Sequence, residues 1–427
     1  MRADPARESG KKRSLRALEA TNFFLADVQT GVGPFLAAYL AGAGWNPGRV
    51  GVALTVGGVV TVALQTPAGA FVDHLRSKRA ILVLGALVLG MGAVLLALTT
   101  APWAVYAAQV LIGGAGPFLA PTLGAITLGL VGRKFFDRQF GRNQGFNSAG
   151  NVACALLIAG VSHAFGNRAI FITTGVLTIP TILAVLFVRA GDINYEWARG
   201  GSTKAANSPS SKAEPIHRAL LGDRVLAMFL ACAFLFHLAN AAMLPELGEM
   251  LAKTSNAGVA PLMSACILVT QAIITCTAAF IGRLANARGR KPLLLIGFGV
   301  LPLRAVLYTL THSTGNLIAI QVFDGIANAI FGVVSILVIA DRTEGTGRFN
   351  LLQGALATMV GLGAALSNLL GGKIVQYGSF RSSFLALGAV AVIAVVLLQF
   401  GVPETLTKPG ASGDSPMLEP ETPGSLA

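Results

Sequence analysis

Residues 69–79 read Gly-Ala-Phe-Val-Asp-His-Leu-Arg-Ser-Lys-Arg, and residues 282–291 read Gly-Arg-Leu-Ala-Asn-Ala-Arg-Gly-Arg-Lys. Each stretch is a short, basic connection between two long apolar runs. Their first glycines lie 213 positions apart, at 69 and 282. Two related stretches at a long spacing indicate an internal repeat.

Two further matches recur at nearly the same spacing. Residues 109–113 (QVLIG) lie 212 positions before residues 321–325 (QVFDG). Residues 34–36 (PFL) lie 211 positions before residues 245–247 (PEL). Three near-identical offsets predict that the chain consists of two related halves.

The composition excludes an ordinary soluble protein of this length. Of the 427 residues, 54% are hydrophobic and only 12% are charged, whereas about 25% are charged in a typical globular domain. The apolar content also excludes a disordered chain. We therefore predict an all-α membrane protein.

Apolar runs long enough to cross a bilayer, about 20 residues each, occur twelve times. They lie at 20–41, 50–71, 80–99, 102–130, 145–165, 168–188, 223–244, 259–282, 292–310, 315–340, 351–372 and 381–402. The prediction is twelve transmembrane helices in two pseudo-symmetric six-helix halves.

Polar segments divide these spans six and six. The predicted organisation is a basic N-terminal segment (1–19), an N-terminal half (20–188), a linker (189–222), a C-terminal half (223–402) and a tail (403–427). The linker and the tail are rich in Gly, Ser and Pro, so we expect the linker to be flexible and the tail to be disordered.

The distribution of basic residues predicts the orientation in the membrane. Of the 32 Lys and Arg residues, 26 fall in the segments on the side of the termini, five fall in the opposite loops and one falls within a span. Cytoplasmic segments carry the excess of Lys and Arg. We therefore expect both termini to be cytoplasmic in a multi-pass protein of the cell inner membrane. The net charge of +13 then follows from topology, and no nucleic-acid partner is expected.

The repeated loop resembles the signature of the major facilitator superfamily, Gly-x-x-x-Asp-(Arg/Lys)-x-Gly-(Arg/Lys)-(Arg/Lys). Its matching positions are Gly69, Asp73, Lys78 and Arg79 in the first copy, and Gly282, Gly289, Arg290 and Lys291 in the second. His74, Ser77 and Asn286 depart from the signature. The resemblance implies that these loops form gating latches, and that the second latch is the weaker one because Asn286 replaces the acid.

The resemblance further implies a secondary active transporter that works by alternating access. We expect proton-coupled efflux of a small organic compound, with a proton-coupled uptake symporter as the alternative and a non-transporting receptor as a remoter one. No Gly-x-x-x-x-Gly-Lys-(Ser/Thr) sequence for ATP occurs. The protein is expected to be a monomer in the lipid bilayer, not an enzyme, and to use no cofactor or metal, since its four Cys lie in apolar runs without Cys-x-x-Cys spacing.

Charged residues inside the spans need a partner, a cavity or a proton pathway. Arg304 and Asp324 lie roughly 12 and 13 Å from the outer side at 1.5 Å per residue, so neighbouring antiparallel helices would place them level. They are predicted to form an ion pair, to bind substrate, or to take part in proton transfer.

Asp27 has no basic residue within its own span, so it is the predicted carrier of the coupling proton, with a structural acid as the alternative. His237 is a second candidate for proton coupling, and Asp324 is a third. The predicted substrate cavity is lined by Gln109, Asn240, Arg304 and Asn328, although uncharged polar groups inside spans also hold helices together. Proton-driven drug antiporters usually carry an Arg in the fourth span near Gly113, and this chain offers Gln109 in its place.

Overall fold

The computed structural model describes residues 5–75, 77–199, 223–254, 259–311, 313–343 and 349–406. Some side chains within these ranges lie outside the description, among them those of Asp27 and Asp73. The described residues form helices and connections, without a strand. The helices are α1 (Pro5–Gly42), α2 (Pro47–His74), α3 (Lys78–Leu98), α4 (Pro102–Val131), α5 (Arg133–Phe165), α6 (Arg168–Phe187), η1 (Ala190–Asp192), η2 (Trp197–Arg199), α8 (Arg224–Asn240), α9 (Met243–Thr254), α10 (Val259–Arg288), α11 (Lys291–Leu310), α12 (Thr314–Ala319), α13 (Gln321–Thr343), α14 (Phe349–Tyr377) and α15 (Phe380–Gly401).

Eleven segments of the described chain are long and apolar enough to cross a membrane. Two of these segments contain an interrupted helix: Arg224–Lys253 covers α8 and most of α9, and Thr314–Thr343 covers α12 and α13. Helix α1 is a further helix of 38 residues. The protein is therefore an all-helical, multi-pass membrane protein.

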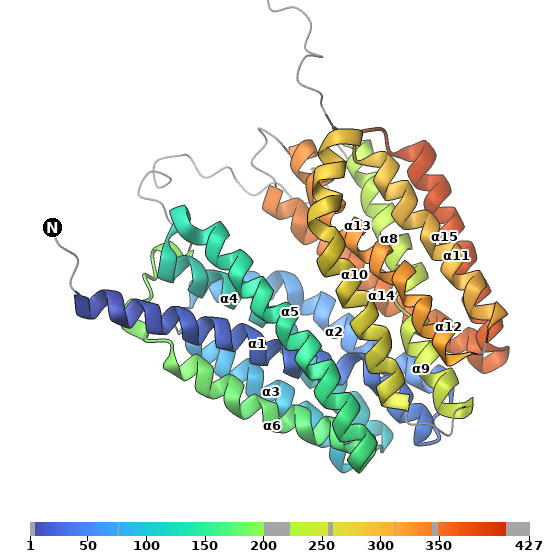
Figure 1. Ribbon diagram of the computed structural model, residues 1–427, viewed down its shortest axis with the longest axis horizontal. Helices are drawn as coiled ribbons and strands as arrows, with labels where there is room; N and C mark the ends of the chain where they lie inside the picture. Colours follow the sequence, from blue (N-terminus) through green and yellow to red (C-terminus); the bar gives the residue numbers. More distant parts are fainter. Residues whose placement is uncertain are drawn as a thin grey trace, which may run out of the picture.

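The helices gather in two groups, α1–α6 (the N-group) and α8–α15 (the C-group), which are inclined to each other (Figure 1). We call the side where α1 begins and α15 ends the terminal side, and the other the opposite side. Across the boundary between the groups, α2 packs along α14, α1 packs against α9, and α5 packs against α10. The groups approach on the opposite side and splay apart toward the terminal side (Figure 1).

The hydrophobic core is divided in the same way. One cluster, the shared core, joins both groups near the opposite side and includes Phe35, Leu247, Met263 and Phe384. The other two clusters each belong to one group, and they lie toward the terminal side. Among the described residues, the buried apolar cluster that joins the two groups therefore lies near the opposite side.

Small residues allow the contact between α2 and α14 on the opposite side. A Cβ atom added to Gly51 would lie 2.3 Å from the carbonyl oxygen of Asn368, and one added to Gly372 would lie 2.6 Å from that of Pro47. Thr55 Oγ1 also donates to the carbonyl oxygen of Ala365 at 2.9 Å. Close backbone approach through small residues is a usual way to pack helices in a membrane. Here it closes the opposite side.

The structure corrects the predicted linker and tail where it describes them. Residues 189–199 are not a loose connection, because Ile193 and Ala198 are buried in the N-group core and Asn194 N donates to the carbonyl oxygen of Gly129. Residues 403–406 are also packed, since Glu404 and Thr405 bond to the C-group. The remainder of the linker (200–222) and of the tail (407–427) lies outside the described residues.

Candidate functional site

The strongest polar contact inside the helices joins α11 to α13. Arg304 Nη1 lies 2.7 Å from Asp324 Oδ1, and the Arg304 residue is fully buried. Each helix supplies one charge, as the matching depths of the two residues predict. Burying either charge alone would be costly, whereas the pair compensates both.

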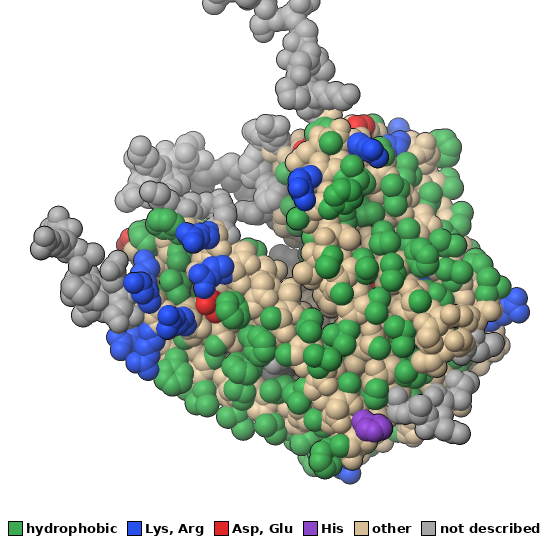
Figure 2. Space-filling model, in the orientation of Figure 1, with side chains coloured by type: hydrophobic (Ala, Val, Ile, Leu, Met, Phe, Trp, Pro, Cys, Tyr) green, Lys and Arg blue, Asp and Glu red, His purple; other side chains and the backbone are tan. Residues whose placement is uncertain are grey.

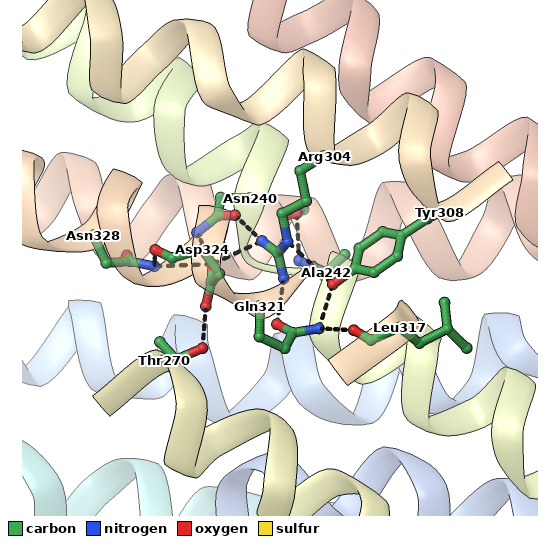
Figure 3. A network of polar contacts seen from close by, with 10 residues as sticks. Asn240, Ala242, Thr270, Arg304, Tyr308, Leu317, Gln321, Asp324 and Asn328 are labelled. Atoms are coloured by element: carbon green, nitrogen blue, oxygen red, sulfur yellow. Dashed lines mark hydrogen bonds and ion pairs between the residues drawn. The ribbon is translucent and has the colours of Figure 1, made fainter. Parts of the chain in front are cut away.

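Three uncharged donors complete the surroundings of Asp324 (Figure 3). Its Oδ1 accepts from Asn240 Nδ2 at 3.3 Å and from Asn328 Nδ2 at 2.9 Å, and its Oδ2 accepts from Thr270 Oγ1 at 3.2 Å. These residues come from α8, α13 and α10. One carboxylate therefore ties four helices of the C-group together.

The guanidinium of Arg304 is equally well bonded (Figure 3). It donates to Asn240 Oδ1, to the Tyr308 hydroxyl at 3.1 Å and to Gln321 Oε1 at 3.3 Å. Gln321 Nε2 donates in turn to the Tyr308 hydroxyl at 2.6 Å. We call this set of residues the polar network: Asn240, Thr270, Arg304, Tyr308, Gln321, Asp324 and Asn328.

Helix interruptions coincide with the polar network. Helix α8 ends at Asn240, and α9 begins at Met243. Helix α12 ends at Ala319, and α13 begins at Gln321. Discontinuous helices commonly form the binding sites of membrane transporters, because their ends present polar groups at membrane depth. The interruptions here place Asn240 and Gln321 beside the ion pair.

Four residues that the sequence predicts belong to this network, namely Asn240, Arg304, Asp324 and Asn328. Three further members were not predicted, namely Thr270, Tyr308 and Gln321. Tyr308 lies one helical turn after Arg304, and Gln321 lies three positions before Asp324, so helical spacing from the two charges would have found both.

The other predicted site residues in the spans lie apart from these bonds. His237 Nδ1 lies 3.1 Å from the carbonyl oxygen of Ala233 in its own helix, and its ring meets that of Phe331 edge to face. Gln109 Nε2 donates to the carbonyl oxygen of Ala53 at 3.1 Å and thereby joins α4 to α2. Asp27 lies in α1, and its side chain is outside the described part of the structure.

Two further acids, Glu246 and Glu249, are buried in the structure and were not predicted from the sequence. Glu246 and Glu249 lie in α9, which extends the seventh predicted span ten residues past its predicted end at 244. Each residue is 2% exposed. Ser383 donates to Glu246 Oε1 at 2.8 Å, but Oε2 of Glu246 and Oε2 of Glu249 have no hydrogen-bond partner among the described residues. The apolar run through Met250 and Leu251 was the signal that the span continues.

The repeated loops make matching contacts in the two groups. Lys78 Nζ donates to the carbonyl oxygen of Val72, and Arg290 Nη1 donates to that of Ala285. These donors lie 212 positions apart (78 and 290), and the acceptors lie 213 positions apart (72 and 285). In both loops, a buried basic side chain folds back onto the end of the preceding helix.

The next basic residue of each loop repeats the pattern. Arg79 Nη2 donates to the carbonyl oxygen of Leu186 at the end of α6, and Lys291 Nζ donates to that of Gln399 at the end of α15. The donors are again 212 positions apart (79 and 291), and the acceptors are 213 apart (186 and 399). Gly69 lies in α2 and Gly282 in α10, whereas the Asp73 side chain is outside the described residues.

The second loop is fixed by two acids of the C-group, one in α13 and one in the segment that follows α15. Arg290 Nε lies 3.0 Å from Asp341 Oδ2, and Glu404 accepts from the backbone N–H groups of Arg290 and Lys291 at 2.8 and 3.1 Å. Gly289 has a φ of +101°, and a Cβ there would lie 2.3 Å from Glu404 Oε2. We call Gly289, Arg290, Asp341 and Glu404 the loop clamp. It compensates for the missing acid at Asn286, whose Oδ1 accepts from Arg290 Nη1 at 2.8 Å.

The electrostatics of the loop clamp depend on Glu404. Partial burial raises the pKa of Glu404, but hydrogen bonds from the backbone N–H groups of Arg290, Leu406, Lys291 and Thr405 outweigh this effect, so that its pKa lies below the ordinary value. The side chain also sits at the beginning of α11, where the helix dipole favours a negative charge. Glu404 is therefore a hydrogen-bonded anion at the beginning of α11.

Helices that cross a membrane, two interrupted spans and a polar network buried beside the interruptions are the features of a membrane transporter. The sequence matches the Major Facilitator Superfamily over residues 20–301 and 230–422. The chain belongs to this family.

Known proteins similar to this chain agree with that assignment. An uncharacterized MFS-type transporter of Mycobacterium tuberculosis is 39% identical over 395 residues, which cover 92% of this chain and 94% of the relative. A uridine/deoxyuridine transporter of Lactococcus lactis is 26% identical over 196 residues, which cover 46% of this chain and 39% of that protein. The crystal structure of the nucleoside transporter NupG has the same fold, with a TM-score of 0.75 at 15% identity, covering 90% of this chain and 98% of NupG.

Proposed function

We propose that this protein exports a small organic compound in exchange for protons, by alternating access between two pseudo-symmetric six-helix halves, with α1 as the twelfth span. The observation that carries this proposal is the division of the hydrophobic core, which is shared on the opposite side and separate on the terminal side. A transporter whose halves rock around a central site has this arrangement in one of its two end states.

The matching loop contacts support the proposed pseudo-symmetry. Arg79 and Lys291 occupy equivalent places, because each bonds to the last turn of the sixth helix of its own half. We propose that both loops act as gating elements at the terminal side, and that the loop clamp holds the second of them. On this proposal each loop moves as a unit with its own half.

The proposed orientation places the terminal side on the cytoplasmic face of the inner membrane. The excess of Lys and Arg in the segments of the terminal side supports it. In this proposal the described conformation is open to the cytoplasm, and the contact between α2 and α14 closes the path to the outside.

The proposed proton carriers are Asp27, Glu246 and Glu249, with His237 and Asp324 as further candidates. A carboxylate buried without partners is costly in its charged form, and one oxygen on each of Glu246 and Glu249 lacks a partner among the described residues. Helix α9, which carries both acids, packs against α1, which carries Asp27. Opening of the opposite side would expose α9 to external water, so a proton exchanged there would be linked to the conformational change.

The substrate would bind beside the polar network. Asn328 is only partly buried, so its amide is the group of the network that can most readily form a hydrogen bond to a ligand. The ion pair of Arg304 and Asp324 would hold the surrounding helices in place. A cavity of about 420 Å³ between α8 and α14 is apolar, with Leu230, Phe234 and Met359 in its lining. We propose that it accepts the apolar part of an organic compound. We retain Gln109 as a proposed part of the cavity lining in the N-group.

A second candidate function is the uptake of a nucleoside together with protons. The name of the Lactococcus lactis relative favours it, since that protein is a uridine/deoxyuridine transporter. Polar side chains such as Asn240 and Asn328 would then bind the base or the sugar.

Transport by the purified protein in proteoliposomes tests the proposed function. The assay presents labelled nucleosides, organic cations, organic anions and neutral apolar compounds under an imposed pH gradient. Export by proton exchange predicts that one compound accumulates in vesicles whose interior is acidic, and that an uncoupler abolishes its accumulation. Accumulation in vesicles with an alkaline interior would support uptake together with protons. Facilitated transport at a rate that does not depend on the pH gradient would reject proton coupling.

A further inference from the structure

A basic pocket lies at the terminal end of the N-group, away from the polar network. It has a volume of about 250 Å³ and lies where α1, the end of α4 and the beginning of α5 meet. Three basic side chains line it, namely those of Lys11, Arg138 and Arg142. The repeat, the loop clamp and the proposed transport cycle do not account for this concentration of positive charge.

The charge of the pocket is only partly neutralised by the described side chains. Glu19 is buried behind it and lies 2.9 Å from Arg142 Nη2. Gln139 Nε2 also donates to Glu19 Oε1, at 3.0 Å. No described acid forms an ion pair with Lys11 or Arg138. The charges of Lys11 and Arg138 are therefore not neutralised by a described side chain, and they can attract an anion.

The rest of the lining is apolar. Leu15, Val131 and Phe135 contribute to it, and Phe135 is 54% exposed. Val131 is the last residue of α4, so the pocket lies at the terminal end of a membrane-spanning helix. Figure 2 shows Lys and Arg side chains gathered at this end of the N-group, next to a surface on which hydrophobic side chains predominate.

We propose that this pocket binds the phosphate group of an anionic membrane phospholipid. Lys11 and Arg138 would contact the phosphate oxygens. Arg142 would attract the phosphate electrostatically while it remains paired with Glu19. Leu15 and Phe135 would contact the glycerol and the first carbons of the acyl chains. Basic pockets between helices on the cytoplasmic side are known to bind anionic headgroups. The apolar lining favours a lipid over a soluble phosphate compound.

Lipid binding to the full-length protein in nanodiscs tests this proposal. The probe is phosphatidylglycerol, added in increasing proportion to phosphatidylcholine, and the readout is the number of retained phosphatidylglycerol molecules by native mass spectrometry. The test variant is the double substitution Lys11→Gln with Arg138→Gln. The control is Lys12→Gln with Arg288→Gln, which removes two exposed charges of the terminal side that do not line the pocket.

The proposal predicts a high-affinity phosphatidylglycerol molecule on the wild type and on the control. Its affinity should fall on the order of tenfold in the test variant, because each basic residue near the surface contributes to the attraction. The unfolding temperature in phosphatidylcholine alone should be equal for the two double variants. Equal loss of binding in both double variants would overturn the proposal. Displacement of phosphatidylglycerol by inorganic phosphate or glycerol phosphate at comparable concentration would also overturn it, in favour of a soluble anion.

Discussion

Arg304 and Asp324 meet through a contact of 2.7 Å between Nη1 and Oδ1, and 20 positions separate them in the sequence. Both lie inside the C-group, and every partner that the structure gives them belongs to that group. The pair therefore stabilises the C-group rather than its contact with the N-group. In the proposed alternating-access cycle, a network of this kind would stay intact while the groups move, and would present a fixed surface to the substrate.

The first prediction concerns this pair. Arg304→Leu or Asp324→Leu alone leaves one buried charge without its partner, which costs about 3 to 5 kcal/mol. The double variant removes both charges and should unfold at a higher temperature than either single variant. Thermal unfolding of the detergent-solubilised proteins measures this difference. Additive losses in the double variant would reject a coupled pair.

The second prediction concerns Glu246. Glu246→Gln keeps an oxygen that accepts from Ser383 and removes the ionisable group, so the unfolding temperature should change little. Transport driven by a pH gradient should nevertheless fall to background. Glu196→Gln removes an exposed acid outside the helices that span the membrane, and it should behave as the wild type. Full gradient-driven transport by Glu246→Gln would make Glu246 structural and leave proton coupling to Asp27 or Glu249.

The third prediction is a pH dependence of stability through Glu404. Because the pKa of Glu404 in the folded protein lies below its ordinary value of 4.5, the stability that its charge contributes is fully present above that value. The contribution is lost as the pH falls through the lower, folded-state pKa. Glu404→Gln should therefore unfold at a lower temperature than wild type at pH 7, and the two curves should converge below pH 4.5. A constant difference at all pH values would show that the charge of Glu404 is not involved.

Gly289 provides a related test of the loop clamp. Its positive φ is unfavourable for any residue with a side chain, at roughly 1 to 2 kcal/mol, and a Cβ would also press on Glu404. Gly289→Ala should lower the unfolding temperature. Combining Gly289→Ala with Glu404→Gln should cost less than the sum of the two single changes, because they disturb one contact. Strict additivity would separate the glycine from the clamp.

The fourth prediction is the topology. Cys276 is the exposed member of the four cysteines, whereas Cys154, Cys232 and Cys266 are buried, so Cys276→Ser gives a background of low reactivity. On that background, Ala43→Cys in the turn between α1 and α2 should react with a membrane-impermeant thiol reagent in intact cells. Gly191→Cys, in η1 on the terminal side, should react only after the cells are opened. The reverse pattern would invert the orientation.

Much of the fold could be predicted from sequence, because a membrane imposes the length and composition of each span. The apolar runs, the repeat and the matching depths of Arg304 and Asp324 can all be predicted from the order of residues along the chain. The sequence does not reveal the helix interruptions after Asn240 and before Gln321, because the apolar pattern continues through both. We ended the seventh span at 244 although apolar residues recur as far as Leu251, and therefore overlooked Glu246 and Glu249.

The second loop was predicted to form the weaker latch, but in the structure residues outside the motif bond to it. Asn286 replaces an acid, and from the sequence alone this substitution predicts a weaker latch. In the structure, acids more than 50 positions further along the chain, Asp341 and Glu404, take over the bonding of Arg290 and of its backbone. Compensation of this kind depends on tertiary contacts, which the spacing of one motif does not contain.

The most direct test of proton-coupled export is the movement of protons during transport. Proteoliposomes carrying a pH-sensitive dye are loaded with a transported compound and diluted into compound-free buffer, with wild type, Glu246→Gln and Asp27→Asn compared. Exchange predicts that the interior of wild-type vesicles becomes acidic as the compound leaves, and that both variants abolish this signal. An interior that becomes alkaline would establish symport instead. Loss of the compound without any change in pH would contradict proton coupling altogether.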